Sequence, residues 1–302
     1  MKNAEQRLLG FRSHAGRLAA IALGLSSLVI SIGCTGIDRH GAGPNGSGSG
    51  GSSWGDGGPD LSGVAPRDAT MVSDLIQPGD DANCSHDIQA VIRDFRGYTG
   101  PNGEPRHPDF EGATGSLKGI VQDMLGADSK PVYAPAGATR VTAGPTEFDQ
   151  WYRDVAGVNV RIDGITLPLT PSATNPALFG FNNQAFFPIN GMGFDEGMPA
   201  TTNNFHFTTE IHIEFPYRGG EVLTFEGDDD LFLFINGHLA IDLGGVHSAQ
   251  QGMVDLDAQA GAFGIQLGQT YRMDIFHAER HTVESHFRLE TTLGCFKSII
   301  IP

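Results

Sequence analysis

Residues 227–247, GDDDLFLFINGHLAIDLGGVH, contain the pattern that decides the fold of this chain. Three adjacent carboxylates open the stretch, and two short apolar runs follow, separated by Asn236 and Gly237. Asn-Gly between two such runs is the strongest short-range signal for a tight β-hairpin, because both central residues of the turn must tolerate positive φ. The sequence therefore predicts a hairpin that holds the acidic cluster at its open end and brings Asp242 close to it.

The three carboxylates, Asp228, Asp229 and Asp230, repel one another, so some of them must bind protons or share a cation. Hard oxygen ligands on a turn, with backbone carbonyls nearby, suit Ca²⁺. A solvated acidic turn is the alternative that the residues alone leave open. The stretch is not an EF-hand loop, because residues 231–235 are apolar where such a loop needs oxygen ligands and a glycine.

Short alternating segments elsewhere in the chain indicate a mainly β fold. In residues 208–215, Ile211, Ile213 and Phe215 alternate with polar neighbours, as in a strand with one buried face. Four further segments are expected to be strands: 88–95, 222–226, 271–276 and 287–291. Glycine contributes 42 residues and only 18% of residues are charged, which fits many turns between short strands. We expect a β-sandwich or a β-barrel.

Two segments, 116–125 and 146–155, carry apolar residues at helical spacing. In the second segment, Thr146 and Asp149 fit a capping box at the start of a helix. We expect both helices to be short and to cover one side of the β core. Trp151 would serve either as a sugar-stacking platform or as a core residue, and its helical spacing favours the core.

Six further motifs lie in order along the chain: RDF at 93–95, HPDFE at 107–111, FDQWY at 148–152, FFPI at 186–189, NFHFT at 204–208 and AERH at 278–281. With the acidic hairpin, they resemble the fibro-slime domain. This domain is a relative of the protective-antigen-type β-sandwich of bacterial toxins, glycosidases and yeast adhesins. The resemblance covers residues 88–296 and implies such a β-sandwich, with one or two short peripheral helices.

The resemblance also implies a metal site. In protective-antigen-type relatives, two successive aspartates at this strand start are joined by a cis peptide and bind Ca²⁺. Asp228 and Asp229 occupy those places, and Asp230 would add a ligand or face solvent. The resemblance thus implies a calcium-dependent adhesion domain in which sugar hydroxyls complete the coordination of the ion.

Two loops, 242–247 and 279–285, would select the ligand, which we expect to be a carbohydrate or an extracellular matrix polysaccharide. The candidate ligand-binding residues are Asp242, His247, Glu279, Arg280, His281 and Ser285. A structural ion-pair role for the 277–281 loop is the alternative. The loop is not the HExxH helix of zinc proteases, because its glutamate is displaced and no helix is indicated. A zinc site of His277 and His281 with His247 or His286 is a further alternative.

Catalysis is not expected. A glycosidase needs two carboxyls facing across a cleft, and no Ser-His-Asp or Cys-His signature is legible in the sequence. In the wider family this fold is usually an appendage to enzymes rather than the catalytic part. The alternatives to a carbohydrate-binding domain are a structural surface protein, stabilised by calcium and acting through protein contacts, and a glycoside hydrolase.

The N-terminus indicates export. A basic region precedes the apolar residues 18–32, and Ser31 to Cys34 resemble a bacterial lipoprotein cleavage box in which Cys34 is lipidated. An ordinary cleaved signal and an uncleaved anchor helix are the alternatives. We expect an outer membrane lipoprotein or a cell-surface protein that meets the membrane only through its lipid anchor. The net charge of −16 argues against nucleic acid as a partner.

The other two cysteines, Cys84 and Cys295, bracket the region of resemblance. An exported protein with an even pair is expected to form one disulfide, and two separate buried thiols are the alternative. The expected organisation is a signal peptide at 1–33, a lipid-anchored Gly/Ser-rich linker at 34–83, the fibro-slime domain at 84–297 and a tail at 298–302.

Overall fold

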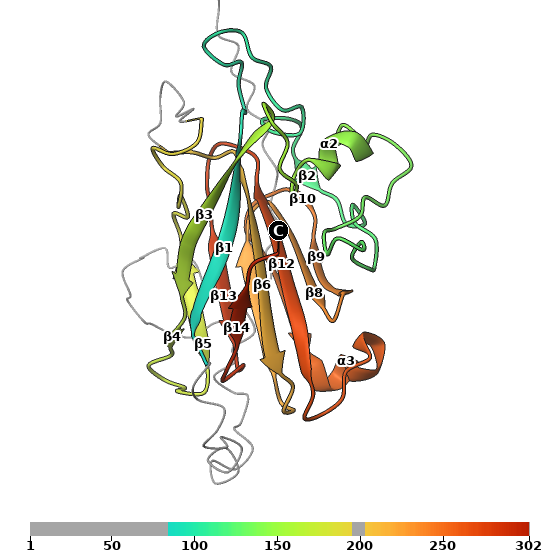
Figure 1. Cartoon of the computed structure of the whole chain (residues 1–302), viewed down its shortest axis with the longest axis vertical. Helices are drawn as coiled ribbons and strands as arrows, with labels where there is room; N and C mark the ends of the chain where they lie inside the picture. The colour runs from blue at the N-terminus through green and yellow to red at the C-terminus, as the bar shows by residue number, and fades with distance from the viewer. Residues whose placement is uncertain (1–83, 195–202, 302) are drawn as a thin grey trace, which may run out of the picture. The chain divides into compact units, whose positions relative to one another are not determined.

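The computed structural model describes residues 84–194 and 203–301, whose strands form two large antiparallel sheets (Figure 1). Cys34, the predicted signal peptide and the predicted linker lie outside these residues. Within the described ranges, no helix has the length and apolar character needed to cross a lipid bilayer.

The first sheet contains seven strands: β1 (Asp87–Phe95), β3 (Asn159–Pro168), β6 (Phe207–Pro216), β8 (Asp230–Ile235), β9 (His238–Leu243), β12 (Thr270–Glu279) and β14 (Lys297–Ile299). They pair in the order β3-β1-β6-β12-β8-β9, with β14 paired to β6. The second sheet contains five strands: β4 (Thr170–Pro171), β5 (Phe179–Asn183), β7 (Val222–Gly227), β11 (Gln250–Asp255) and β13 (Phe287–Thr291). Their order is β11-β7-β13-β5-β4, and a short ladder joins β2 (Gly115–Ser116) to β10 (Gly245–Val246).

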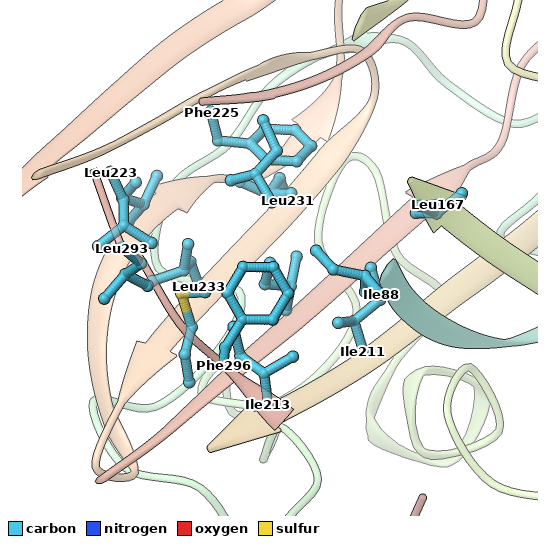
Figure 2. Packing of buried hydrophobic residues seen from close by; sticks show 14 of the residues in the cluster. Ile88, Leu167, Ile211, Ile213, Leu223, Phe225, Leu231, Leu233, Leu293 and Phe296 are labelled. Carbon is cyan, nitrogen blue, oxygen red and sulfur yellow. The ribbon is translucent and has the colours of Figure 1, made fainter. Parts of the chain in front are cut away.

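The main core lies between the two large sheets and makes the domain a β-sandwich, as predicted. Ile211 and Ile213 of β6 reach this core from the first sheet, and Leu223 and Phe225 of β7 reach it from the second (Figure 2). Full burial of an aliphatic or aromatic side chain stabilises a fold by about 1.5–3 kcal/mol. Contacts of this kind hold the sheets face to face.

The outer face of the seven-stranded sheet is covered by residues 117–155, which we call the covering segment. Phe232 of β8 and Phe276 of β12 pack against this segment in a second apolar cluster. Trp151 belongs to the same cluster, is completely buried, and donates from Nε1 to Oδ2 of Asp109 at 2.9 Å. Trp151 is therefore a core residue. Strand β8 is buried on both faces, which explains its uninterrupted apolar sequence.

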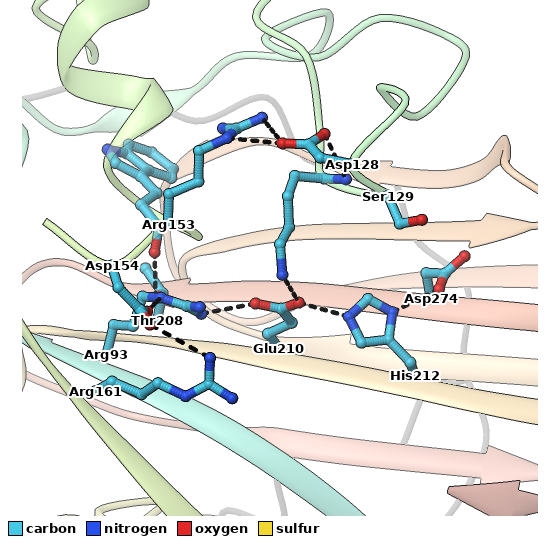
Figure 3. Close-up of polar contacts among 12 residues, drawn as sticks. Arg93, Asp128, Ser129, Arg153, Asp154, Arg161, Thr208, Glu210, His212 and Asp274 are labelled. Atoms are coloured by element: carbon cyan, nitrogen blue, oxygen red, sulfur yellow. Dashed lines mark hydrogen bonds and ion pairs between the residues drawn. The ribbon is translucent and has the colours of Figure 1, made fainter. Parts of the chain in front are cut away.

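A buried ion network fixes the covering segment to the sheet. Lys130 of the segment forms an ion pair with Glu210 of β6. Arg93 and His212 approach the same carboxylate at 2.6 and 2.5 Å (Figure 3). Burial alone would raise the pKa of Glu210, but the hydrogen bond with His212 and the charges of Arg93 and Lys130 outweigh it and lower this pKa to about 2.

Two short helices, α2 (Pro145–Asp149) and α3 (Leu256–Phe263), lie near opposite ends of the seven-stranded sheet (Figure 1). Helix α2 covers only the first part of the helix predicted at 146–155. Its N-cap is Gly144, without a side-chain cap, so the predicted capping box of Thr146 and Asp149 is wrong. Helix α3 was not predicted, although Asp255 caps its start and Gly264 ends it in the left-handed conformation.

The helix predicted at 116–125 is also wrong. The amide of Leu117 donates to the carbonyl of Gly244 at 2.7 Å, and that of Leu125 donates to Gly237 at 3.0 Å. Gly119, with φ 79°, interrupts any helical path. The segment therefore satisfies its backbone against the hairpin, while its apolar side chains still join the second cluster.

The predicted hairpin is confirmed. Strands β8 and β9 pair antiparallel, and Asn236 and Gly237 have φ values of 50° and 79°. The side-chain amide of Asn236 also donates to the carbonyl of Phe263 at 2.9 Å, which ties the turn to the end of α3. At the other end of the hairpin, Asp242 lies opposite Phe232.

The predicted disulfide joins Cys84 to Cys295, whose Cα atoms lie 5.1 Å apart. The two ends of the domain are thereby linked across 211 positions of sequence. The ordered sheet continues beyond the predicted end of the domain, because Ile299 in β14 pairs with His212 in β6. The predicted tail at 298–302 therefore begins too early.

Candidate functional site

Asp228 and Asp229 form the crossing from one sheet to the other, because β7 ends at Gly227 and β8 begins at Asp230. The peptide bond between the two aspartates is cis, as the family resemblance implies. Both residues are buried, with 3% and 5% of their surface exposed. The fold thus brings two carboxylates to the end of the sandwich and removes most of their contact with water.

Asp228 is held by His286, in the loop that precedes β13. The backbone amide of His286 donates to its Oδ1 at 2.5 Å, and Nδ1 of His286 lies 2.7 Å from its Oδ2. The carbonyl oxygen of Asp228 lies 2.8 Å from Nε2 of His277, which is completely buried. These contacts fix the orientation of both the side chain and the backbone of Asp228.

Asp229 accepts two backbone hydrogen bonds, one from each predicted ligand loop. His247 donates to Oδ1 and Arg280 donates to Oδ2, both at 3.0 Å. Burial raises the pKa of Asp229 to about 8; Arg280 opposes this shift, whereas Asp230 and Asp228 add to it. Near neutral pH this carboxyl would hold its proton unless further positive charge is supplied.

Glu279, the last residue of β12, is the least satisfied group of the site. Only 1% of its surface is exposed, and neither carboxylate oxygen makes a hydrogen bond of ordinary geometry to a described residue. The neighbouring hydroxyl of Ser285 donates to the carbonyl of Phe186 at 2.8 Å. Burial raises the pKa of Glu279 well above its ordinary value, and the charges of Asp229 and Asp228 raise it further, whereas weaker contacts with the Ser285 hydroxyl and the His281 backbone oppose the shift. Ionising a buried carboxyl with so little support from hydrogen bonds is costly, and a bound cation would reduce that cost.

Asp230 has a different environment from its two neighbours. Its Oδ1 accepts from the amide of Gly245 at 2.6 Å, and its Oδ2 lies 2.6 Å from Nη2 of Arg280. Arg280 also donates to the carbonyls of Asp109 and Val141, at 2.9 and 2.8 Å. Both Asp230 and Arg280 are buried and engaged inside the protein. The side chain of Arg280 is therefore not accessible to a ligand in the pocket.

A pocket of about 570 Å³ opens at Asp228 and Asp229. It contains two of the predicted ligand-binding residues, His247 and His281. The remaining lining residues are Thr114, Gly115, Ser116, Val246, Ser248, Val283 and Glu284. The pocket therefore combines hydroxyl, imidazole and carboxylate groups with two valines, and Val283 is 79% exposed at its rim.

The other four predicted ligand-binding residues, Asp242, Glu279, Arg280 and Ser285, do not line this pocket. The carboxylate of Asp242 accepts from the amides of Gly119 and Gly244, at 2.7 and 3.0 Å. Burial raises the pKa of Asp242, and these two hydrogen bonds oppose the shift. Ser285 is buried against Phe186, as described above. The side chains of Asp242 and Ser285 hold the loops of the site in place.

Glu111 was not singled out from the sequence as a site residue, although it lies in the HPDFE motif. It accepts from the amide and the hydroxyl of Thr282, and lies 3.0 Å from Nε2 of His206. Burial alone would raise its pKa, but the hydrogen bonds with His206 and Thr282 lower it to about 2. Glu111 thereby anchors the loop that carries His281 into the pocket.

The zinc alternative built on His277 and His281 does not form. His277 is buried with its Nε2 against the carbonyl of Asp228, whereas Nδ1 of His281 lies 3.0 Å from the carbonyl of Thr282. Among the described residues, no group of three potential metal ligands combines these two histidines.

No family model matches the chain. The chain is similar to three proteins of Dictyostelium discoideum: psiR, 40% identical over 207 residues, psiQ, 38% identical over 201 residues, and psiD, 38% identical over 202 residues. The matches cover 64%, 62% and 62% of this chain, but 20%, 20% and 38% of those relatives. The chain thus spans well under half the length of these relatives.

Among solved structures, a PA14 sugar-binding domain from an RTX adhesin is similar over 70% of this chain and 95% of its own length, with 7% identity and a TM-score of 0.27. A beta-glucosidase from Kluyveromyces marxianus is similar over 63% of this chain and 20% of its own length. That match has 12% identity and a TM-score of 0.26.

Proposed function

We propose that this domain binds carbohydrate through a Ca²⁺ ion held by Asp228 and Asp229. The observation that carries the proposal is Glu279, a carboxyl buried beside the two aspartates, whose contacts with Ser285 and His281 do not offset the effect of its burial. The ion would supply the missing positive charge and would offer open coordination positions to vicinal hydroxyls of a sugar. Asp230 is omitted from the proposed ligand set, because Arg280 already neutralises it.

The pocket supports a carbohydrate as the ligand. Ser116, His247 and His281 bring hydrogen-bonding side chains to the same opening as the two aspartates. Val283 adds an exposed apolar surface against which the C–H face of a sugar ring can pack. Small-molecule sites commonly combine a few converging polar groups with apolar walls in this way.

The proposal is tested by binding of the purified protein to an array of plant and microbial polysaccharides, with Ca²⁺ and with EGTA. We expect binding only with Ca²⁺, and we expect its loss in Asp229→Asn. Asp123→Asn is the matched control, because Asp123 is exposed in the covering segment, away from the pocket. Glycan binding that survives both EGTA and Asp229→Asn would refute the metal-bridged mechanism.

The same experiment, with a measurement of thermal unfolding, separates a metal that bridges to the sugar from a metal that only stabilises the fold. If Ca²⁺ raises the Tm of the protein but no polysaccharide on the array binds, the result would favour a structural surface protein. We propose binding without turnover, so a released-sugar assay on any bound polysaccharide should stay at its baseline. Sugar release that disappears in Asp228→Asn would instead identify a hydrolase.

The location of the protein is proposed from its sequence alone. We propose export and attachment to the outer membrane or cell surface through lipidated Cys34. Metabolic labelling with a fatty-acid analogue should mark the wild type and leave Cys34→Ser unlabelled. Equal labelling of the two proteins would contradict the anchor.

A further inference from the structure

A second group of potential metal ligands lies next to the proposed calcium site. Asp228, Glu284 and His286 each bring one donor atom to within 4.8 Å of the other two. Nδ1 of His286 lies 2.7 Å from Oδ2 of Asp228 and 4.0 Å from Oε2 of Glu284. The group shares Asp228 with the calcium proposal, and its other two members come from the loop that precedes β13.

The chemistry of this donor set differs from that of the calcium site. Imidazole nitrogen is a ligand for zinc and related transition metals, whereas Ca²⁺ takes six to eight oxygens. Tetrahedral coordination at bond lengths of about 2.0–2.1 Å places ligand atoms roughly 3.3 Å apart. The two distances from His286, 2.7 and 4.0 Å, lie on either side of that separation. Small side-chain adjustments would therefore create a three-ligand site.

The surroundings permit these adjustments. The side chain of Glu284 is 56% exposed and that of His286 is 19% exposed, so both can move toward a common ion. Asp228 is fixed by the amide of His286 and supplies a rigid third ligand. Glu284 and Asp228 both line the pocket, so the site lies at its wall and is accessible from solvent.

We propose that Asp228, Glu284 and His286 bind a divalent transition-metal ion of the zinc class. The ion would replace the direct contact between Nδ1 of His286 and Oδ2 of Asp228. Three protein ligands leave a fourth position for water or for a group of a bound ligand, as in open zinc sites. This site requires neither Ca²⁺ nor a carbohydrate, and it would stand if the proposed function failed.

The sharing of Asp228 has a measurable consequence. One carboxylate must serve both ions, so Zn²⁺ is expected to weaken the binding of Ca²⁺ when both are present. His286→Ala should abolish this interference, because it removes the nitrogen ligand but keeps both carboxylates and the backbone amide that donates to Asp228.

The test is calorimetric titration of Zn²⁺ into the full-length, calcium-free protein. One equivalent should bind to the wild type and to Asp229→Asn, while His286→Ala and Glu284→Gln should weaken binding by about tenfold or more. His238→Ala is the matched control, because it removes a half-buried histidine of β9 that does not line the pocket. Thermal unfolding of each variant establishes that it is folded.

Three outcomes separate this proposal from the preceding one. Equal Zn²⁺ affinity in the wild type and in His286→Ala overturns the zinc-class site. Absence of Zn²⁺ binding to the wild type, with Ca²⁺ binding intact, also overturns it and leaves the calcium proposal standing. Zn²⁺ binding that depends on His286 in a protein that does not bind Ca²⁺ supports this site and rejects the calcium proposal.

Discussion

The backbone amide of Arg280 donates a 3.0 Å hydrogen bond to Oδ2 of Asp229, although the two residues lie 51 positions apart in sequence. The side chain of the same arginine neutralises Asp230, at 2.6 Å. Arg280 therefore serves two of the three aspartates in different ways. Burial still raises the pKa of Asp229, although the charge of Arg280 opposes that shift, and it raises the pKa of Glu279 as well.

Glu279→Gln should separate the destabilising effect of this buried carboxyl from its contribution to Ca²⁺ binding. Without metal, the variant should be at least as stable as the wild type, because it lacks a buried acid that is costly to ionise. A ligand at a hundred times its Kd stabilises a folded protein by about 2.7 kcal/mol, or roughly 5–10 °C in a domain of this size. We expect Ca²⁺ to raise the Tm of the wild type by that amount and the Tm of Glu279→Gln by less than half of it.

The measurement is thermal unfolding in Ca²⁺ and in EGTA at pH 8. Glu214→Gln is the control, because Glu214 lies on β6, outside the pocket. The calcium-dependent rise in Tm should be unchanged in this control. An equal rise in Glu279→Gln would remove Glu279 from the cation site.

The ion pair of Arg280 and Asp230 predicts that losing Arg280 greatly lowers the free energy of unfolding and that a second substitution at Asp230 restores part of it. Arg280→Met leaves a completely buried carboxylate without its partner, which typically costs 3–5 kcal/mol. Changing Asp230 to Asn as well removes the stranded charge, so the double variant should be more stable than Arg280→Met. Urea unfolding of both single variants and the double variant measures the coupling, and purely additive losses would contradict the pair.

The ion network at Glu210 predicts a specific response to acid (Figure 3). The pKa of Glu210 is about 2 in the folded protein, against an ordinary value of 4.5. The ionised carboxylate therefore contributes its full stabilisation above about pH 4.5, and this contribution is lost as the pH falls toward 2. A shift of this size corresponds to roughly 3 kcal/mol. Glu210→Gln should therefore be less stable than the wild type at pH 6, and the difference should shrink as the pH falls.

Urea unfolding at intervals between pH 6 and pH 2 measures this difference. Glu214→Gln, on the same strand, is the matched control. A constant difference for Glu210→Gln would show that the carboxylate contributes no pH-dependent stability.

The parts of the fold that sequence predicted correctly depend on local chemistry. Asn236 and Gly237 identify the hairpin because few other residues accept the positive φ that the turn requires. Alternation identifies β6 because one face of that strand meets the main core. The resemblance added the cis peptide between Asp228 and Asp229 and the sandwich, which spacing alone left undecided.

The parts that sequence missed depend on distant contacts. Residues 116–125 carry helical spacing, yet the amides of Leu117 and Leu125 bond to Gly244 and Gly237 of the hairpin region. Arg280 was expected to face a ligand, but a long charged side chain shows its burial only once its partner Asp230 is placed. The burial of Glu279 likewise results from the packing of several strands, and no local pattern encodes it.

The contribution of the hairpin turn to stability can be tested by comparing two uncrowded glycines, one in the turn and one in a helix. An added Cβ would meet no atom within 4 Å at either Gly237 or Gly261, so steric crowding does not distinguish them. Gly237 has φ 79°, where alanine is disfavoured by roughly 1–2 kcal/mol, whereas Gly261 lies inside α3. Gly237→Ala should therefore destabilise the domain by about that amount, while Gly261→Ala should stabilise it by about 0.5–1 kcal/mol. Urea unfolding midpoints measure both shifts, and shifts of the same sign would show that the conformation of the turn does not govern the stability of the hairpin.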